Sequence, residues 1–482
     1  LSESAEKKLQ SYHWPGNVAE LENVLNGAAI LSSENIIESD HLFFPSRATG
    51  DRPVYNLFRY TQLSNLLKEK VFPNLFGNIG LVIFYLSILS MLFSPGENFL
   101  NSFFWSTGWF LIFLFTFLIG RVFCAVCPFM VSGEIARKLK NFNMTRSGTI
   151  SQHGEKLSMF FIFIILWMEG AFGFQEKPIF TALLLLTITS GAVICAVFFE
   201  RRVWCRYLCP LGSLLGISSL TSIFSLDADK HVCMYRCGTH ECYTGKETEP
   251  GCQLFLHPYA IESQQDCVLC MQCHKNCPYG SVKLNLQFPG TGIVAVASPS
   301  VGVALTSTAL VGILPAESGG LLAPGNDFFN KIANGMGIND IPLYTAIFFC
   351  AAALPSLLLL LMERFLGGHD LKKSVYRLSR FGYSLLPFAI LGHIAFYGQK
   401  TILWLEAIIS RTGVTGIDFF SANIVLYGIY VTLVLLGAAG TIHTFIRIHR
   451  SDPPALTTGR KLMVGYTALI GFYTILYLLA VL

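Results

Sequence analysis

Long apolar runs limit what this chain can fold into more strongly than any single motif. Nine segments are long enough, or nearly long enough, to cross the hydrocarbon core of a bilayer as helices. Only 13% of the residues are charged, about half the share that soluble proteins carry. The sequence therefore predicts a mainly α, polytopic helical membrane protein. The apolar segments cover approximately residues 76–93, 103–120, 157–174, 178–199, 293–315, 343–362, 382–398, 421–445 and 462–482.

The basic residues between these segments predict the orientation of the chain. Clusters of Lys and Arg follow the second, fourth, sixth and eighth segments, and the alternate loops hold few basic residues. Lys and Arg favour the cytoplasmic side, so these loops and the N-terminus are expected in the cytoplasm and the C-terminus outside. This orientation requires segment 293–315 to span, although Pro299 interrupts it. The predicted location is the cytoplasmic (inner) membrane.

The number and spacing of the Cys residues predict that the chain binds metal. Twelve of the 14 Cys occur in ordered motifs that the orientation places in or beside the reducing cytoplasm, where structural disulfides are rare and metal ligation is the first interpretation. Three closely spaced thiolates suit one [4Fe–4S] cluster, and a fourth Cys followed by Pro suits the ligation of a second. Zinc is the competing interpretation, but it explains neither the third Cys nor the Cys-Pro ending. The strongest motif is Cys267-x2-Cys270-x2-Cys273-x3-Cys277-Pro278.

Four further Cys upstream supply the right number of thiolates for a two-cluster module. Their spacings are wider and irregular, so a zinc site or free thiols remains the alternative for this set. The segment from His231 to Leu286 is predicted to be a two-cluster ferredoxin module set into the loop after the fourth apolar segment. With the ligand exchange typical of such modules, the predicted sets are Cys233, Cys237, Cys242 and Cys277 for one cluster, and Cys267, Cys270, Cys273 and Cys252 for the other.

The remaining motifs form an internal repeat. Arg-Val-Phe-Cys124-Ala-Val-Cys127-Pro follows the second apolar segment, and Arg-Val-Trp-Cys205-Arg-Tyr-Leu-Cys209-Pro follows the fourth. Pro directly after a Cys suits the first turn of a helix, whose free N–H groups stabilise a thiolate. Two such units related by pseudo-symmetry would bring four thiolates together at the membrane face and hold a third iron–sulfur centre. The alternative is a packing motif with free thiols.

Paired Cys-Pro motifs behind membrane segments, followed by a ferredoxin loop, resemble the membrane-bound polyferredoxin-type proteins of the NapH, NosR and FixG kinds. The resemblance covers about residues 75–290. It implies [4Fe–4S] clusters, a membrane location and electron transfer, often to or from quinols. The first motif departs from the family because it has two residues between its Cys, where three are more common.

The N-terminal segment has a different character. We expect a helix over Ser4–Tyr12, a turn, and a helix over Val18–Leu31. Trp14-Pro-Gly-Asn-Val followed by Glu-Leu-Glu-Asn resembles the lid subdomain of the AAA+ module in sigma-54-dependent transcriptional activators; a coincidental helical hairpin is the alternative. Ala19 occupies the position of an ATP-sensing Arg, and the chain lacks a Gly-rich phosphate-binding loop with a Lys, so this sequence alone does not support ATPase activity.

Because the chain begins at Leu1 without a signal peptide, we expect it to be a fragment of a longer polypeptide. Residues 46–74 suit either a helix on the anionic inner leaflet or a solvated linker. The predicted domains are a lid-like subdomain at 1–45, this connection at 46–74, a four-span membrane domain at 75–224, the ferredoxin-type domain at 225–290 and a C-terminal membrane domain of about five spans at 291–482.

Several polar residues and two further Cys lie within or beside the apolar segments. His393 and His443 lie at different depths of their segments, so a haem held by both is not expected, and they are interpreted as polar packing groups. Glu169, near the outer end of the third segment, is a candidate proton or quinol group by the general rule for intramembrane acids. Cys195 and Cys350 are interpreted as small core residues.

The leading hypothesis is a membrane iron–sulfur protein that passes electrons between a quinol or a cytoplasmic donor and an unidentified acceptor. One alternative is a redox-sensing regulator in which the membrane domain controls an upstream AAA+ module; sigma-54 RNA polymerase would be a partner only with that module present. A second alternative is an assembly factor that delivers metal or reducing power to another enzyme. The sequence shows no acid–base pair or nucleophilic triad, so it predicts no catalytic residue, and this segment is not expected to bind nucleic acid.

Overall fold

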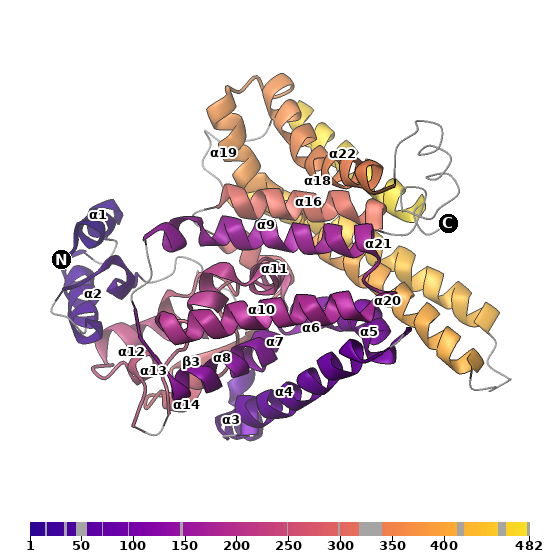
Figure 1. Cartoon of the computed structure of the whole chain (residues 1–482). Coiled ribbons are helices and arrows are strands. Elements are labelled where there is room, and N and C mark those ends of the chain that lie inside the picture. The colour runs from indigo at the N-terminus through magenta and orange to yellow at the C-terminus, as the bar shows by residue number, and fades with distance from the viewer. Residues whose placement is uncertain are drawn as a thin grey trace.

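Helices dominate the protein, as the sequence predicts (Figure 1). The structure is a computed structural model, and it describes all residues except 15–16, 33–35, 45–54, 70, 95, 145–147, 248, 297–298, 318–339, 412–418, 452–458 and 480–482. The strands named among the described residues form one small antiparallel sheet in the order β1-β3-β2. They are β1 (Tyr55–Asn56), β2 (Phe224–Ala228) and β3 (Val282–Leu286).

Seven helical runs in the described part of the chain are long and apolar enough to cross a membrane, which confirms the polytopic prediction. They comprise α4 (Val71–Leu92), the run from α5 (Phe99–Phe103) through a π-helical turn to α6 (Trp109–Leu118), α10 (Pro178–Phe198), α18 (Asp340–Phe365), α19 (Leu371–Phe381) with α20 (Leu386–Arg411), α21 (Phe419–Ser451) and α22 (Arg460–Leu479).

Among the described residues, seven of the nine predicted segments have the length and hydropathy of a span. The other two predicted segments form α9 (Gly148–Phe172) and α16 (Val301–Glu317). With 17 residues, α16 is shorter than the roughly 20 that a perpendicular span needs. Charged side chains at both ends of α9, such as Glu155 and Glu169, reduce its apolar length. The orientation of the termini stays a prediction.

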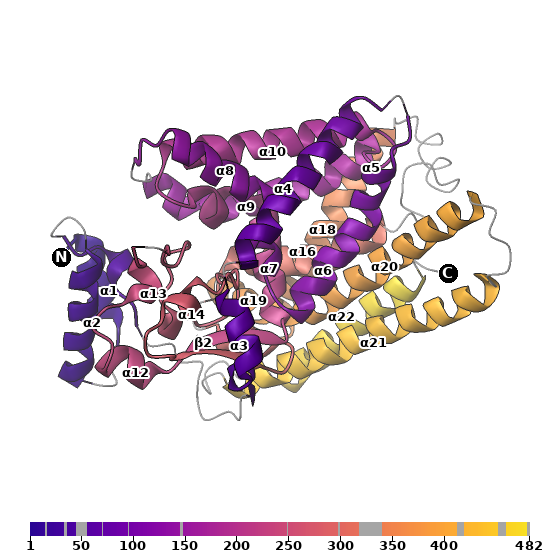
Figure 2. The same ribbon diagram turned by 90° about the horizontal axis from the view of Figure 1, so that it is seen from below.

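The C-terminal helices enclose α20, which is buried on nearly all sides along its first half. It packs most extensively against α21 and also contacts α6 and α16 (Figure 2). Apolar side chains around its whole circumference, including Phe388, Ile390 and Ile394, explain this central position.

A buried ion pair joins three of these helices. The Nε atom of Arg377 on α19 lies 2.6 Å from the carboxylate of Glu363 on α18, and both side chains are almost inaccessible to solvent. The hydroxyl of Tyr466 on α22 donates to the other carboxylate oxygen at 2.9 Å. The network satisfies both oxygens of the acid, which a buried carboxylate requires.

The N-terminal segment forms a separate small core at one end of the molecule (Figure 1). The helices α1 (Glu3–Ser11) and α2 (Asn17–Leu31) lie within a residue of the predicted ranges. Ser2 caps α1 by accepting a hydrogen bond from the amide of Ala5 at 3.2 Å. The side chain of Ala19 lies outside the described residues. After the segment 45–54, α3 (Thr61–Lys68) packs against the ferredoxin module, where Ser64 and His274 are hydrogen bonded at 3.0 Å.

Candidate iron–sulfur sites

The repeated Cys-Pro motifs begin two short helices, as the sequence predicts. Cys127 is the N-cap of α8 (Pro128–Leu139) and Cys209 is the N-cap of α11 (Pro210–Ser218), each with Pro in the first turn. The amide of Gly212 donates to the Cys209 sulfur at 3.2 Å, so the helix start presents N–H groups to this thiol. The first Cys of each motif lies just upstream: Cys124 in α7 (Val122–Ala125) and Cys205 in a π-helical turn (Trp204–Leu208).

These four Cys, named here the membrane-face thiols, line one cavity together with Arg121 and Arg202. Burial, together with the neighbouring Cys205 and Cys124, raises the pKa of the Cys209 thiol to about 12. Four thiolates are therefore unfavourable here without a compensating cation, which iron would supply. The sequence prediction that the two motifs converge agrees with this placement.

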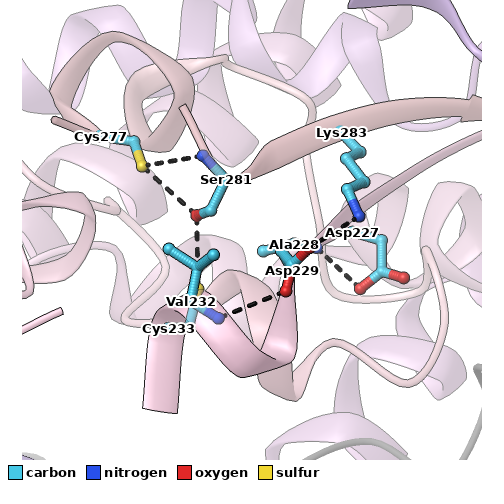
Figure 3. Close-up of polar contacts among 8 residues, drawn as sticks. All are labelled: Asp227, Ala228, Asp229, Val232, Cys233, Cys277, Ser281 and Lys283. Atoms are coloured by element: carbon cyan, nitrogen blue, oxygen red, sulfur yellow. Dashed lines mark hydrogen bonds and ion pairs between the residues drawn. The ribbon is translucent and has the colours of Figure 1, made fainter. Parts of the chain in front are cut away.

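A second group of thiols, named here the first ferredoxin site after its predicted role, includes two that contact Ser281 (Figure 3). The Ser281 hydroxyl lies 3.4 Å from the sulfur of Cys233 on α12 (Lys230–Tyr235) and 3.4 Å from the sulfur of Cys277. Cys242, on α13 (Glu241–Thr244), is close enough to interact electrostatically with Cys233, Cys237 and Cys277. Cys277 follows α14 (Gln272–Asn276). The four members are Cys233, Cys237, Cys242 and Cys277, the set that the sequence predicts.

The second ferredoxin site consists of the other four Cys of the module, which line one cavity: Cys252, Cys267, Cys270 and Cys273. Backbone amides point at two of the sulfurs, with Leu269 N 3.5 Å from Cys267 Sγ and Leu256 N 3.4 Å from Cys252 Sγ. Leu269 and Met271 adopt left-handed backbone angles, with φ of 52° and 61°, so the loop curls around its sulfurs. Cys252 thus lies with the later Cys of the module and Cys277 with the earlier ones. The ligand exchange itself stays a prediction.

The three groups follow one another away from the membrane helices. The Arg121 charge acts on both Cys124 of the membrane-face thiols and Cys267 of the second ferredoxin site. The second site in turn adjoins the first, because Cys252 interacts electrostatically with Cys242. The order is therefore membrane-face thiols, second ferredoxin site, first ferredoxin site.

The donor set at each location fits a [4Fe–4S] cluster, which four Cys thiolates hold. Within the described residues, no three His, Cys, Asp or Glu side chains converge to hold a single metal ion. None of the 14 Cys, all of which are described, forms a disulfide. Cys195 is buried as predicted, whereas Cys350 is exposed on the outer surface of α18, so its interpretation as a core residue is wrong.

A cavity of about 570 Å³ opens beside the membrane-face thiols. Its wall includes Cys205, Arg121, Glu155, Asp266 and Tyr383. Burial raises the pKa of Glu155, and the charge of Asp266 raises it further. The sequence did not predict this cavity, because its walls come from segments far apart in the chain; the only local signal was the Arg that precedes each Cys motif.

Two histidines that the sequence analysis did not single out lie at the first ferredoxin site. The Nε2 atom of His257 is 3.6 Å from the Cys242 sulfur, and His240 lies 3.0 Å from the same nitrogen. Burial lowers the pKa of His257 to about 3, so the ring is neutral at physiological pH. His393 is buried in α20, and His443 on α21 lies 5.5 Å from the Phe288 ring.

The family model of a 4Fe-4S binding domain matches residues 101–145 and 181–223, which include all four membrane-face thiols. The resemblance to membrane polyferredoxin-type proteins is confirmed. The chain is 26% identical over 224 residues to the uncharacterized protein MJ0749 of Methanocaldococcus jannaschii, covering 45% of the chain and 86% of that relative. It is 28% identical over 204 residues to the putative electron transport protein YccM of Escherichia coli, covering 37% of the chain and 55% of YccM.

The N-terminal segment of the chain matches a different family model. Residues 1–53 match the model of an AAA+ ATPase lid domain. The sigma-54-dependent transcriptional regulator SfnR of Pseudomonas fluorescens is 37% identical over 76 residues, which cover 16% of this chain and 20% of SfnR. No solved structure matches the chain.

Proposed function

We propose that the protein passes electrons from a membrane quinol through three [4Fe–4S] clusters to an acceptor that docks at the ferredoxin module. The family match and the similarity to YccM support a general role in iron–sulfur electron transfer. The observation that carries the proposal is the line of three four-thiol groups that starts at the membrane face. In this proposal the membrane-face thiols and both ferredoxin sites act as the ligand sets.

Iron–sulfur clusters supply one-electron chemistry at the positions where they are bound. The chain's own residues determine their surroundings. Arg121 and Arg202 line the cavity of the membrane-face thiols and offset its negative charge. Backbone amides of Gly212, Leu256 and Leu269 donate to sulfur atoms, which stabilises thiolate ligands and tunes cluster potentials.

The cavity beside Cys205 suits the head group of a quinol. Its volume of about 570 Å³ falls within the range of small-molecule sites, and it combines apolar walls such as Met159 with a few polar groups. Arg121 and the Tyr383 hydroxyl can hydrogen bond the ring oxygens. Glu155 can accept one of the two protons that a quinol releases together with its two electrons.

The test uses the full chain, purified without oxygen and reconstituted in lipid, with a short-chain quinol as the reductant. We expect the visible absorption of the clusters to bleach on quinol addition. In Cys205→Ser the remaining clusters should stay oxidised with quinol but bleach with dithionite. Cys195→Ser, which alters a buried Cys outside the cavity, should behave like the native protein. Equal bleaching of both variants by quinol would place electron entry elsewhere.

One observation favours a regulatory function as a second candidate. The lid-like subdomain packs directly on the first ferredoxin site: Phe43 lies in one apolar cluster with Cys233 and Tyr259. The Tyr259 hydroxyl donates to the Phe43 carbonyl at 3.0 Å, and the Phe43 ring lies 5.9 Å from that of His257. A change in cluster charge at this site would act on the subdomain through these contacts.

Amide hydrogen exchange distinguishes the regulatory function from electron transfer alone. If the first site regulates the lid-like subdomain, protection of α2 should differ between the oxidised and dithionite-reduced full chain. The difference should disappear in Cys242→Ser, which removes a thiol of the first site. Identical protection of α2 in both redox states would reject the regulatory candidate and leave electron transfer unaffected.

A further inference from the structure

Partly buried charged side chains lie at the end of the helical bundle opposite the Cys motifs. Glu169 on α9, Glu317 at the end of α16 and Lys400 on α20 are close enough to interact electrostatically. Glu169 lies 14 residues beyond Glu155 on the same helix, so the group is about 21 Å from the cavity beside Cys205. This distance separates the group from the iron–sulfur sites.

Glu317 stands out within this group. Both of its carboxylate oxygens are buried, and neither has a hydrogen-bond partner within the described parts of the chain. Unpaired buried charges are costly, and two carboxylates against one ammonium leave a net charge of minus one. One bound proton would neutralise the group.

The other titratable groups that face these acids come from three helices. Tyr344 of α18, Tyr397 of α20 and Tyr477 of α22 all interact electrostatically with Glu317. The Tyr344 hydroxyl occupies the space that a side chain at Gly170 would fill, so the glycine next to Glu169 admits this phenol.

Polar residues on one face of α20 lead from the acids into the bundle. His393, Tyr397 and Lys400 are spaced four and three residues apart, which places them on the same side of the helix. The Lys400 ammonium lies 5.7 Å from the centre of the Tyr397 ring, whose centre is 6.3 Å from that of His393. His393 is 1% exposed, and among the described residues its Nε2 atom has no hydrogen-bond partner.

We propose that Glu169, Glu317 and Lys400 form a proton-exchange site, with Tyr397 and His393 extending it into the C-terminal membrane domain. The site binds one proton on the carboxylate pair and releases it to water at this end of the bundle. Ionisable groups inside a membrane domain generally mark ion or proton pathways. The site gives the C-terminal helices a proton-handling role that is independent of the clusters.

The test is a pH titration of the full chain in lipid, followed by infrared difference spectroscopy. We expect a carbonyl stretching band of a protonated carboxyl group that shifts in D₂O and disappears as the pH rises. The band should be absent in Glu317→Gln and retained in Glu176→Gln, which alters an exposed acid near the same end. In Lys400→Met the band should persist to a pH higher by roughly 1–3 units, because the ammonium no longer favours the charged carboxylates.

Iron content and cluster absorption, measured on each variant, verify folding independently of the site. Should Glu317→Gln fail to fold, Glu169→Gln replaces it, with the same expected loss of the band. An identical titrating band in the native protein and the glutamine variant would overturn the proposal. A band that responds to sodium at fixed pH, with choline as the control, would also overturn it and identify a metal-cation site.

Discussion

Replacing Cys205 with Ser should lower the iron content of the full chain from about twelve to about eight atoms per molecule. The expectation follows from three groups of four thiols, each suited to one cluster with four irons. Cys205 lines the cavity at the membrane face, and no Cys of the ferredoxin sites lines that cavity. The measurement is iron per protein after anaerobic purification, combined with low-temperature paramagnetic resonance of the reduced sample.

Two further variants serve as controls for the iron loss expected in Cys205→Ser. Cys195→Ser should retain about twelve irons, because this Cys belongs to none of the three groups. Cys277→Ser should also fall to about eight, with loss of the signal from the first ferredoxin site and not of the second. About eight irons in the native protein would reject a cluster at the membrane face. Loss of both ferredoxin signals in Cys277→Ser would contradict the separate assignment of their ligands.

Replacing Arg377 with Met should destabilise the C-terminal domain by about 3–5 kcal/mol, which is the usual cost of leaving one partner of a buried ion pair without compensation. The Glu363 carboxylate, fully buried and 2.6 Å from the Arg377 Nε atom, would then lose its closest cation and keep the Tyr466 hydroxyl at 2.9 Å and the His369 ring nitrogen at 3.7 Å. Unfolding in mixed micelles with increasing SDS measures the change, with the loss of helical circular dichroism as the signal.

Two companion variants show whether the stability lost in Arg377→Met comes from the uncompensated charge of Glu363 or from lost side-chain packing. Tyr466→Phe removes one hydrogen bond and should cost about 1–3 kcal/mol, since one carboxylate oxygen loses its donor. The double variant Glu363→Gln with Arg377→Met removes both charges and should recover part of the stability lost in Arg377→Met. If the double variant is less stable than Arg377→Met alone, the effect arises from lost packing of the long Arg side chain rather than from an uncompensated charge.

The features that the sequence predicted well are those encoded locally. Pro after Cys127 and Cys209 marks the two helix starts that the structure shows. The spacing of Cys267, Cys270, Cys273 and Cys277 predicts the ligand exchange, which stays a prediction. The convergence of the two Cys-Pro motifs was predictable because the motifs repeat. Segment 293–315, which the sequence predicts as one span, is interrupted: α15 (Thr291–Ala295) ends before Pro299, and α16 begins only at Val301.

Features that depend on distant segments were not predictable. The cavity beside Cys205 combines residues from the N-terminal subdomain to Tyr383, and hydropathy carries no information about such packing. The exposure of Cys350 could not be read from an apolar segment, because lipid and protein both accept apolar side chains. The sequence likewise did not predict the ion pair between Arg377 and Glu363, because both residues lie between apolar segments, where charged side chains are expected in loops.

In the proposed ligand sets, Cys252 and Cys277 cross between the two ferredoxin sites, which makes the assembly of the sites interdependent. Each site takes three Cys from its own half of the module and one from the other half, so neither site is complete until the whole module has folded. The helix α14, which places Cys273 at one site, ends directly before Cys277 at the other. Assembly of either cluster would therefore require both halves of the module, whereas an assembled site keeps four ligands of its own and would survive the loss of its neighbour.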